Sequence, residues 1–289
     1  MNSECSGAPG GLVMPQIWAE LMANNPDSDS LWALVRLFTG EQYEVRPTTR
    51  GNSSDVTALV TCETGPVFVK ACRNRPGGRR ASLVRERLVN PSVRGVVSPA
   101  LRWHAEGDEW LALGFDVIEA RPSRFEPDSP DLGAVVAVVD RFRELALPAE
   151  AANWRESRWD RFAGDDAELF DGATLLFTDI NPDNVVIGDD RAWAVDWSWP
   201  TRGAAFIDPA CLVVQLIAAG HTAAGAEGWV SVCKAWTDAD PRAIDAFAAA
   251  NARMTASFAA RHLDAPWLAD MAEAARAWAA HRGVAVSSD

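Results

Sequence analysis

Several features that define other protein classes are missing from this 289-residue sequence. No apolar run approaches the ~20 residues that a membrane-spanning helix needs. The N-terminal residues have neither a basic start nor an apolar core, so we expect no secretory signal. The five cysteines are scattered without CxxC spacing, which argues against a disulfide framework or a zinc site and favours a reducing cytoplasm. The four histidines are isolated and indicate no metal site either.

An excess of positive charge is also missing, since the formal net charge is −13. Nucleic-acid-binding proteins need positive faces, so we expect neither a nucleic-acid nor a membrane partner. Acidity is compatible with a cationic substrate, although it also serves solubility alone. The length and the 48% hydrophobic content allow two lobes, each with its own core.

Residues 174–199 hold the most informative pattern in the chain. Residues 175–177, 185–187 and 192–195 are short apolar segments typical of strands, and the last two are separated by a turn-like sequence at 188–191. Strands joined by so short a turn pair as an antiparallel hairpin. The hairpin predicts that Asn184, at its start, lies close to Asp196, at its end.

Asp179 lies five positions before Asn184, which is the spacing of the kinase catalytic loop. In phosphoryl transfer a carboxylate orients the acceptor hydroxyl and takes its proton, while an Asn oxygen and a second carboxylate hold magnesium on the nucleotide phosphates. Asp179, Asn184 and Asp196 provide these groups. Asp and Asn are also common in turns, so this motif alone leaves an ordinary loop open.

The segment resembles the catalytic core of the aminoglycoside phosphotransferase family, small-molecule kinases with the protein-kinase fold. That family usually has His-Gly-Asp-Leu-His-Pro-Gly-Asn followed by Ile-Asp-Trp, and this chain has Phe-Thr-Asp-Ile-Asn-Pro-Asp-Asn at 177–184 and Val-Asp-Trp at 195–197. Phe177, Thr178 and Asp183 depart from the pattern. The resemblance implies that Asp179 is the catalytic base and that Asn184 and Asp196 bind Mg²⁺. The alternative is a non-catalytic, pseudokinase-like regulatory protein that binds nucleotide without transferring phosphate.

Lys70 lies inside an apolar strand predicted at 67–72, where an unpaired ammonium is costly to bury. Kinases pair such a lysine with a glutamate on the next helix to hold the nucleotide phosphates. Residues 81–89 have a helical pattern, and Glu86 is their only acidic residue. We therefore predict a Lys70–Glu86 ion pair at the nucleotide; the alternative is that both side chains face solvent.

Two further nucleotide contacts follow only from position in a kinase-like fold. The loop at 48–55 would cover the phosphates with backbone N–H groups, which predicts contacts from Gly51, Ser53 and Ser54. By resemblance to the family's hinge, Asp116, Val117 and Ile118 would meet the adenine. No Ala-Pro-Glu anchor follows Asp196, which argues against a protein kinase.

The expected fold is α+β: a protein-kinase-like bilobal chain with a small antiparallel N-terminal sheet carrying one helix and a mainly helical C-terminal lobe. We expect an N-terminal nucleotide-binding lobe at 1–115, with 1–12 disordered, and a hinge and helical lobe at 116–289. Helical spacing predicts helices at 13–23, 31–38, 131–145 and 154–163, and Asp208 is expected both to cap a helix and to brace the catalytic loop, as in the family. Six aromatic residues are expected to pack in the helical core: Trp229, Trp236, Phe247, Phe258, Trp267 and Trp278.

The resemblance implies an ATP- and Mg²⁺-dependent phosphotransferase in the cytoplasm. It would phosphorylate a hydroxyl of a small molecule such as an aminoglycoside or another antibiotic, and so act in antibiotic resistance. A cationic acceptor would suit an acidic lining, for which the candidates are Asp165, Asp166, Glu168 and Asp183.

Overall fold

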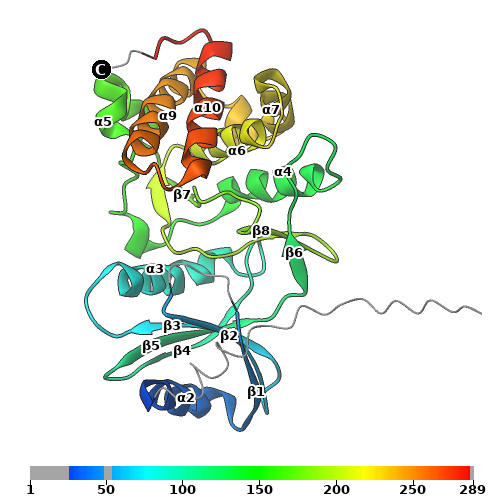
Figure 1. Cartoon of the computed structure of the whole chain (residues 1–289), viewed down its shortest axis with the longest axis vertical. Helices are drawn as coiled ribbons and strands as arrows, with labels where there is room; N and C mark the ends of the chain where they lie inside the picture. The colour runs from blue at the N-terminus through cyan, green and yellow to red at the C-terminus, as the bar shows by residue number, and fades with distance from the viewer. Residues whose placement is uncertain (1–25, 49–53, 287–289) are drawn as a thin grey trace, which may run out of the picture.

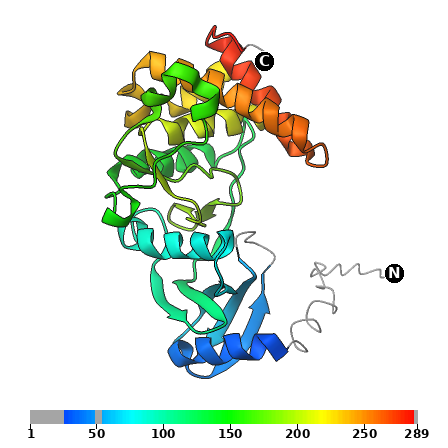
Figure 2. The ribbon, with the colours of Figure 1, turned by 90° about the vertical axis from the view of Figure 1, so that its left-hand side faces the viewer.

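The structure is a computed structural model and describes residues 26–48 and 54–286. The chain forms two lobes, a sheet-containing N-terminal lobe and a helical C-terminal lobe (Figures 1 and 2). The predicted disorder of residues 1–12 and the predicted helix at 13–23 lie outside the described residues.

The N-terminal lobe is built on a five-stranded antiparallel sheet with the strand order β1-β2-β3-β5-β4. Its strands are β1 (Gln42–Pro47), β2 (Val56–Cys62), β3 (Val67–Arg73), β4 (Leu101–Glu106) and β5 (Trp110–Asp116). Alternate side chains of a strand point to opposite faces. In β3, Val67, Val69 and Ala71 join one hydrophobic cluster, whereas Phe68 and Cys72 join another. Lys70 therefore shares its face with Phe68 and Cys72.

A helix covers each face of this sheet (Figure 1). Helix α2 (Pro26–Thr39) buries Leu31 and Val35 against one face, and this region is where helical spacing predicted a helix. Helix α3 (Gly78–Val93) buries Leu83 against the other face, the face that carries Lys70. The helix predicted at 81–89 is thus present and extends further at both ends.

The C-terminal lobe is mainly helical around one large hydrophobic cluster. Two small sheets, β6-β8-β9 and β10-β7, lie on its side toward the N-terminal lobe (Figure 1). Of the helices in the described residues, none has both the length and the apolar character needed to cross a bilayer. The elements, with η for 3₁₀ helices, are β6 (Ala120–Pro122), α4 (Leu132–Asp140), η1 (Arg141–Glu144), η2 (Ala149–Ala151), α5 (Asp160–Ala163), η3 (Gly164–Phe170), β7 (Thr174–Leu176), β8 (Val185–Gly188), β9 (Ala192–Ala194), β10 (Thr201–Gly203), α6 (Ile207–Ala218), α7 (Ala223–Val230), α8 (Lys234–Thr237), α9 (Pro241–Arg261) and α10 (Pro266–His281).

Two predictions for this lobe are wrong. The helix predicted at 154–163 is reduced to α5, because the backbone before it pairs with β10: Glu156 N–H donates to the Arg202 carbonyl at 2.8 Å, and Arg202 N–H donates to the Trp154 carbonyl at 2.7 Å. Trp229 and Trp267 were expected in the core but are 37% and 63% exposed. Phe247 and Trp278 are fully buried, as predicted.

Arg85, on α3, connects the two lobes. Its guanidinium lies over the rings of Trp154 and Trp199, 4.8 and 5.4 Å from their centroids. It also donates to the Pro200 carbonyl at 3.4 Å. Both tryptophans belong to the C-terminal lobe, so the helix that carries Glu86 is held from both sides.

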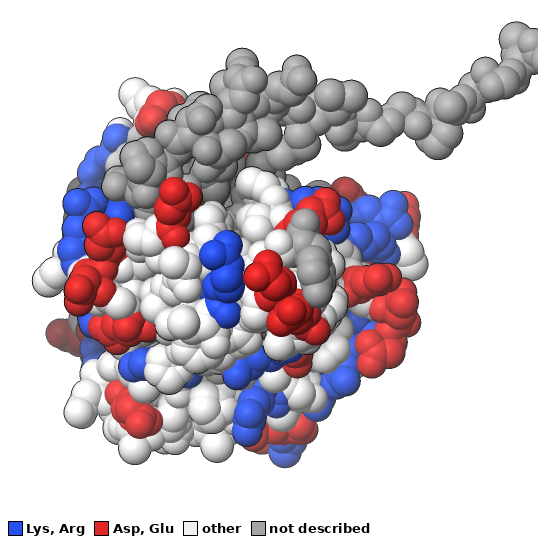
Figure 3. Space-filling model, turned by 90° about the horizontal axis from the view of Figure 1, so that it is seen from below, with Lys and Arg blue, Asp and Glu red and all other residues white. Residues whose placement is uncertain are grey.

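Charged residues of both signs alternate over the end of the molecule formed by the N-terminal lobe (Figure 3). On this visible face they surround an area of other residues and do not form a field of one sign. The negative net charge is therefore not concentrated on this face.

Candidate active site

A pocket of about 1210 Å³ lies between the lobes. Pockets for one small ligand usually have about 300–1,000 Å³, so this volume has room for two bound molecules. The charged side chains that line it, among the described residues, are one lysine and six carboxylates: Lys70, Glu86, Asp116, Asp179, Asp183, Asp196 and Asp270. The cleft is thus far more acidic than the face seen in Figure 3.

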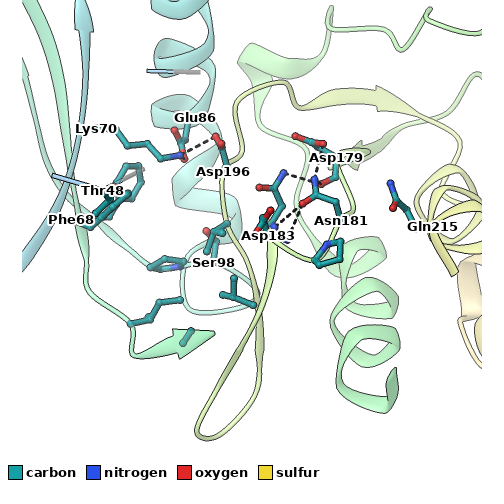
Figure 4. A pocket seen from close by; sticks show the side chains of 18 of the residues that line it. Thr48, Phe68, Lys70, Glu86, Ser98, Asp179, Asn181, Asp183, Asp196 and Gln215 are labelled. Atoms are coloured by element: carbon teal, nitrogen blue, oxygen red, sulfur yellow. Dashed lines mark hydrogen bonds and ion pairs between the residues drawn. The ribbon is translucent and has the colours of Figure 1, made fainter. Parts of the chain in front are cut away.

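Lys70 is held between two carboxylates from different lobes. Its Nζ donates to Glu86 Oε1 at 2.8 Å and to Asp196 Oδ1 at 2.9 Å (Figure 4). Glu86 comes from α3, and Asp196 directly follows the β8–β9 hairpin. Lys70 and Glu86 are buried, and the predicted ion pair is confirmed.

The charges of this triad stabilise one another. Burial alone would lower the pKa of Lys70, but the charges of Glu86 and Asp196 outweigh it and hold that pKa above its ordinary value. Burial raises the pKa of Glu86, with Lys70 opposing the effect. Burial would also raise the pKa of Asp196, yet Lys70 and a hydrogen bond from Ser198 lower it. Asp196 is therefore an anion that faces the cleft beside an ammonium group.

Asp196 and Asn184 offer oxygen ligands for a cation. The hairpin places them as predicted, because β8 pairs with β9 antiparallel and Val195 N–H donates to the Asn184 carbonyl at 2.8 Å. Asn184 Nδ2 donates to the Asp179 carbonyl at 3.1 Å, which fixes the carboxamide. One carboxylate and one carboxamide fit Mg²⁺, which takes few protein ligands and completes its shell with water and phosphate oxygens. Among the described residues, no cluster of three or more His, Cys, Asp or Glu could hold a metal by itself.

Asp179 lies in the loop between β7 and β8 and lines the pocket. Its Oδ1 accepts a hydrogen bond from Asn181 Nδ2 at 3.2 Å (Figure 4). Desolvation raises the pKa of Asp179, the charge of Asp196 adds to this, and the charge of Arg158 opposes it. A carboxylate with a raised pKa beside an acidic cleft is suited to accept a proton.

The residue before it, Thr178, has a left-handed backbone with φ 58°. Asp208 holds this turn, because Oδ1 accepts from Thr178 N–H at 2.7 Å and Oδ2 from Phe177 N–H at 3.1 Å. The expected bracing is therefore present. The expected capping is not, since Asp208 lies in the first turn of α6 and its carboxylate points to the loop. Burial raises the pKa of Asp208 to about 7, although the two N–H groups lower it.

Phe177 replaces the family's usual histidine by apolar packing. It is 2% exposed, with its ring centroid 4.8 Å from Trp197 and 5.5 Å from Phe142. These three aromatic rings pack against one another next to the loop at residues 178–184. A Phe at this position therefore supports the loop from below and leaves the polar groups above it unchanged.

We expect Phe177→His to destabilise the fold by about 1–3 kcal/mol, because an imidazole would be buried among aromatic rings without a matched partner. Chemical denaturation would measure the change. Phe177→Leu, which keeps an apolar side chain of reduced volume, is the control, and its loss of stability should be smaller than that of Phe177→His. An unchanged or higher stability of Phe177→His would show that the loop accepts the histidine of the related family.

The predicted nucleotide contacts are only partly brought together. Asp116, Val117 and Ile118 line the pocket, but Asp116 N–H already donates to the Ala100 carbonyl at 2.9 Å. Gly51 and Ser53 lie outside the described residues. Ser54 is described and is not among the residues that line the pocket.

An apolar slot near the hinge was not predicted from sequence. It is lined by side chains from both lobes, chiefly Leu59, Phe68, Phe115 and Val186. These residues are separated in the chain and have nothing in common except apolar character, so only the fold brings them together. A flat aromatic base fits between such walls.

The far end of the pocket lies under the C-terminal helices. It is lined by Gln215 of α6 and by Trp267, Asp270 and Met271 of α10. Figure 4 shows Gln215 on the side of Asp179 away from Lys70. Of the acidic candidates from sequence, only Asp183 lines the pocket, and Figure 4 shows it on the side of Asp179 toward Lys70. Asp165, Asp166 and Glu168 lie on η3, and Asp166 pairs with Arg242 at 2.8 Å.

Comparisons with known proteins agree with this architecture. No protein-family model matches the sequence, and no curated protein matches it. The fold resembles that of choline kinase LicA from Streptococcus pneumoniae, with a TM-score of 0.59 and 10% identity over 88% of this chain and 99% of that one. It also resembles an aminoglycoside phosphotransferase from Alicyclobacillus acidocaldarius, with a TM-score of 0.53 and 15% identity over 96% of this chain and 97% of that one. A third similar structure is macrolide 2'-phosphotransferase MphH from Brachybacterium faecium, with a TM-score of 0.52 and 15% identity over 86% of this chain and 97% of that one.

LicA has also been solved in complex with AMP, so a neighbour of this fold binds a nucleotide. At these identities the likeness establishes the architecture. The two lobes, the antiparallel sheet and the helical C-terminal part are those of the kinase-like phosphotransferases that act on small molecules. This chain has the protein-kinase-like fold of the aminoglycoside, macrolide and choline phosphotransferases.

Proposed function

We propose that this protein transfers the γ-phosphoryl group of ATP to a hydroxyl of a small, amine-bearing molecule. The observation that carries the proposal is the convergence of Lys70, Glu86 and Asp196 with Asp179 and Asn184 in one cleft. Phosphoryl transfer uses a lysine held by two carboxylates, a further carboxylate and two oxygen ligands.

In this proposal the base of the nucleotide occupies the apolar slot and Lys70 contacts its phosphates. Asp196 and Asn184 would hold Mg²⁺, which neutralises charge on the phosphates. Asp179 orients the acceptor hydroxyl and takes its proton. The acceptor oxygen bonds to the γ-phosphorus, the bond to the bridging oxygen of ADP breaks, and ADP leaves.

A screen with γ-labelled ATP and Mg²⁺ tests the reaction directly. Aminoglycosides, macrolides and small amino alcohols are the first acceptors to try, and we expect label in one of these classes. Magnesium-dependent ATP binding with no labelled product from any hydroxyl compound would favour the non-catalytic regulator instead. Expression in the cytoplasm of a sensitive bacterium would test a role in antibiotic resistance. The measurement is the antibiotic concentration that inhibits growth, which we expect to rise.

The amine follows from the composition of the far end of the pocket. Asp270 provides a carboxylate and Trp267 an exposed indole face, and an indole face also attracts cations. Asp270 and Trp267 are three residues apart on α10, so they lie on the same side of that helix. A protonated amine placed here would leave a hydroxyl of the same molecule toward Asp179.

We expect Asp270→Asn to raise KM for a cationic acceptor by about 2–5-fold, the value of one partly solvated charge contact. The kcat and the KM for ATP should stay within about two-fold of wild type, because Asp270 is remote from the phosphates. Steady-state kinetics at fixed ionic strength measure this. Asp264→Asn is the control, since it removes the same charge from the exposed segment before α10. Equal effects of both variants would contradict a direct contact.

A further inference from the structure

The residue before Asp179 is strained. Thr178 has φ 58°, and among the described residues only Asp196 shares a positive φ without being glycine. A left-handed backbone brings Cβ close to the carbonyl oxygen, and a β-branched residue tolerates this poorly. Such a conformation persists only where neighbouring groups impose it.

The groups that impose it meet at both the backbone and the side chain of Thr178. Asp208 accepts its N–H, as described above. The Thr178 hydroxyl donates to the Phe177 carbonyl at 2.8 Å and accepts a hydrogen bond from Arg158 Nη2. Arg158 is the only one of these partners that comes from the irregular segment before α5.

Arg158 is itself fixed by a buried carboxylate. Its Nε and Nη2 donate to Oε1 and Oε2 of Glu156 at 3.0 and 2.7 Å. Glu156 is 2% exposed, and it also accepts from Arg158 N–H and from the Thr201 hydroxyl, both at 2.8 Å. A two-pronged arginine–carboxylate pair holds the guanidinium in one orientation.

We infer that Arg158 is a positioning residue for phosphoryl transfer, which acts through the hydroxyl of Thr178 to hold the strained turn that aims Asp179. The inference rests on the proposed function, because it concerns the base of that reaction. Arg158 does not line the pocket, so apart from the effect of its charge on the pKa of Asp179 it acts indirectly. Without this hydrogen bond Thr178 can relax to a right-handed or extended backbone, and the Asp179 carboxylate then leaves its place beside the acceptor hydroxyl.

Two substitutions separate this role from a general structural one. Arg158→Gln should lower kcat by about 5–30-fold, the ratio that corresponds to the cost of one left-handed residue. The KM for ATP should change by less than about two-fold, because the Lys70 triad is not touched. Thr178→Gly provides the reference background for the second test, since glycine adopts this backbone freely.

In the Thr178→Gly background, adding Arg158→Gln should lower kcat by less than about three-fold, because glycine no longer needs the restraint. Arg161→Gln is the matched control. It removes an arginine three positions after Arg158 that lies over the ring of Phe162. An equal loss from Arg158→Gln in both backgrounds, or no loss in either, would overturn the inference.

A structural readout keeps the test independent of the proposed reaction. Crystal structures of the Arg158→Gln variant and of the unmodified protein should differ in the backbone at residue 178, with φ negative in the variant. A positive φ in the variant would refute the inference even if the enzyme is active. A negative φ in the variant of a protein that transfers no phosphate would support the role of Arg158 in holding the turn. It would count against the proposed function alone.

Discussion

Asp179→Asn is expected to lower kcat by about 10²–10⁴-fold, the usual contribution of a positioned general base. An amide can still accept a hydrogen bond from a hydroxyl but cannot take its proton at neutral pH. The nucleotide side of the cleft is unchanged, so ATP should bind with a Kd within about three-fold of wild type. Turnover of the acceptor and calorimetric titration of ATP measure the two quantities.

Asp189→Asn, in the exposed turn of the β8–β9 hairpin, is the control for loss of one negative charge. Turnover of Asp179→Asn equal to that of this control would show that Asp179 is not the base. The raised pKa of Asp179 also predicts that kcat/KM of the unmodified enzyme falls with acid above the usual range of an aspartate.

Lys70→Met should destabilise the protein by about 3–5 kcal/mol, the cost of removing one partner of a buried ion pair. Two carboxylates, Glu86 and Asp196, then face each other without the ammonium group that joins them. Chemical denaturation without nucleotide measures the loss. The chain has two lysines, and Lys234→Met is the matched control, because Lys234 pairs with Asp238 at 2.7 Å on the surface with both side chains about 60% exposed.

The loss of stability caused by Lys70→Met should grow as the pH rises. Burial already raises the pKa of Glu86 above the value of an unfolded glutamate, and removing Lys70 raises it further. In the variant the folded state therefore keeps a proton on Glu86 that the unfolded state releases above about pH 4.5. Stability must fall as pH rises from there, so Lys70→Met should be closer to wild type at pH 5 than at pH 8. A loss independent of pH, or equal to that of Lys234→Met, would contradict the coupling.

Sequence reasoning found two parts of the site: the lysine, whose burial without a partner costs free energy, and the residues whose spacing is fixed by the hairpin. A lysine inside an apolar strand requires an anion, and Glu86 was the one acidic residue of the next helix, so the pair could be named in advance. The hairpin fixed Asn184 and Asp196 through the length of its turn. The presence of Phe177 where the related family usually has histidine could be explained too, because an apolar residue that follows a buried strand is expected to pack in the core.

The parts that it missed depend on contacts between distant segments. Arg158 lies in the stretch 154–163 that was predicted as a helix, because the pairing of residues 154–156 with β10 has no local signal. Trp267 fits a helical pattern, yet the side of α10 that it occupies is set by where α6 and α9 pack. Asp165 and Asp270 have the same charge, and only the tertiary fold decides which of them meets the cleft.

The stacking of Arg85 between Trp154 and Trp199 bears on how nucleotide enters and leaves. Each such stacked contact is worth about 0.5–1 kcal/mol at an exposed position, so it resists separation of the lobes weakly and reversibly. Since Arg85 immediately precedes Glu86, a widening of the cleft pulls on the same helical turn that anchors Lys70. In the proposed reaction, departure of ADP from the cleft would therefore also move the turn that anchors Lys70, and the two indole contacts would oppose that movement.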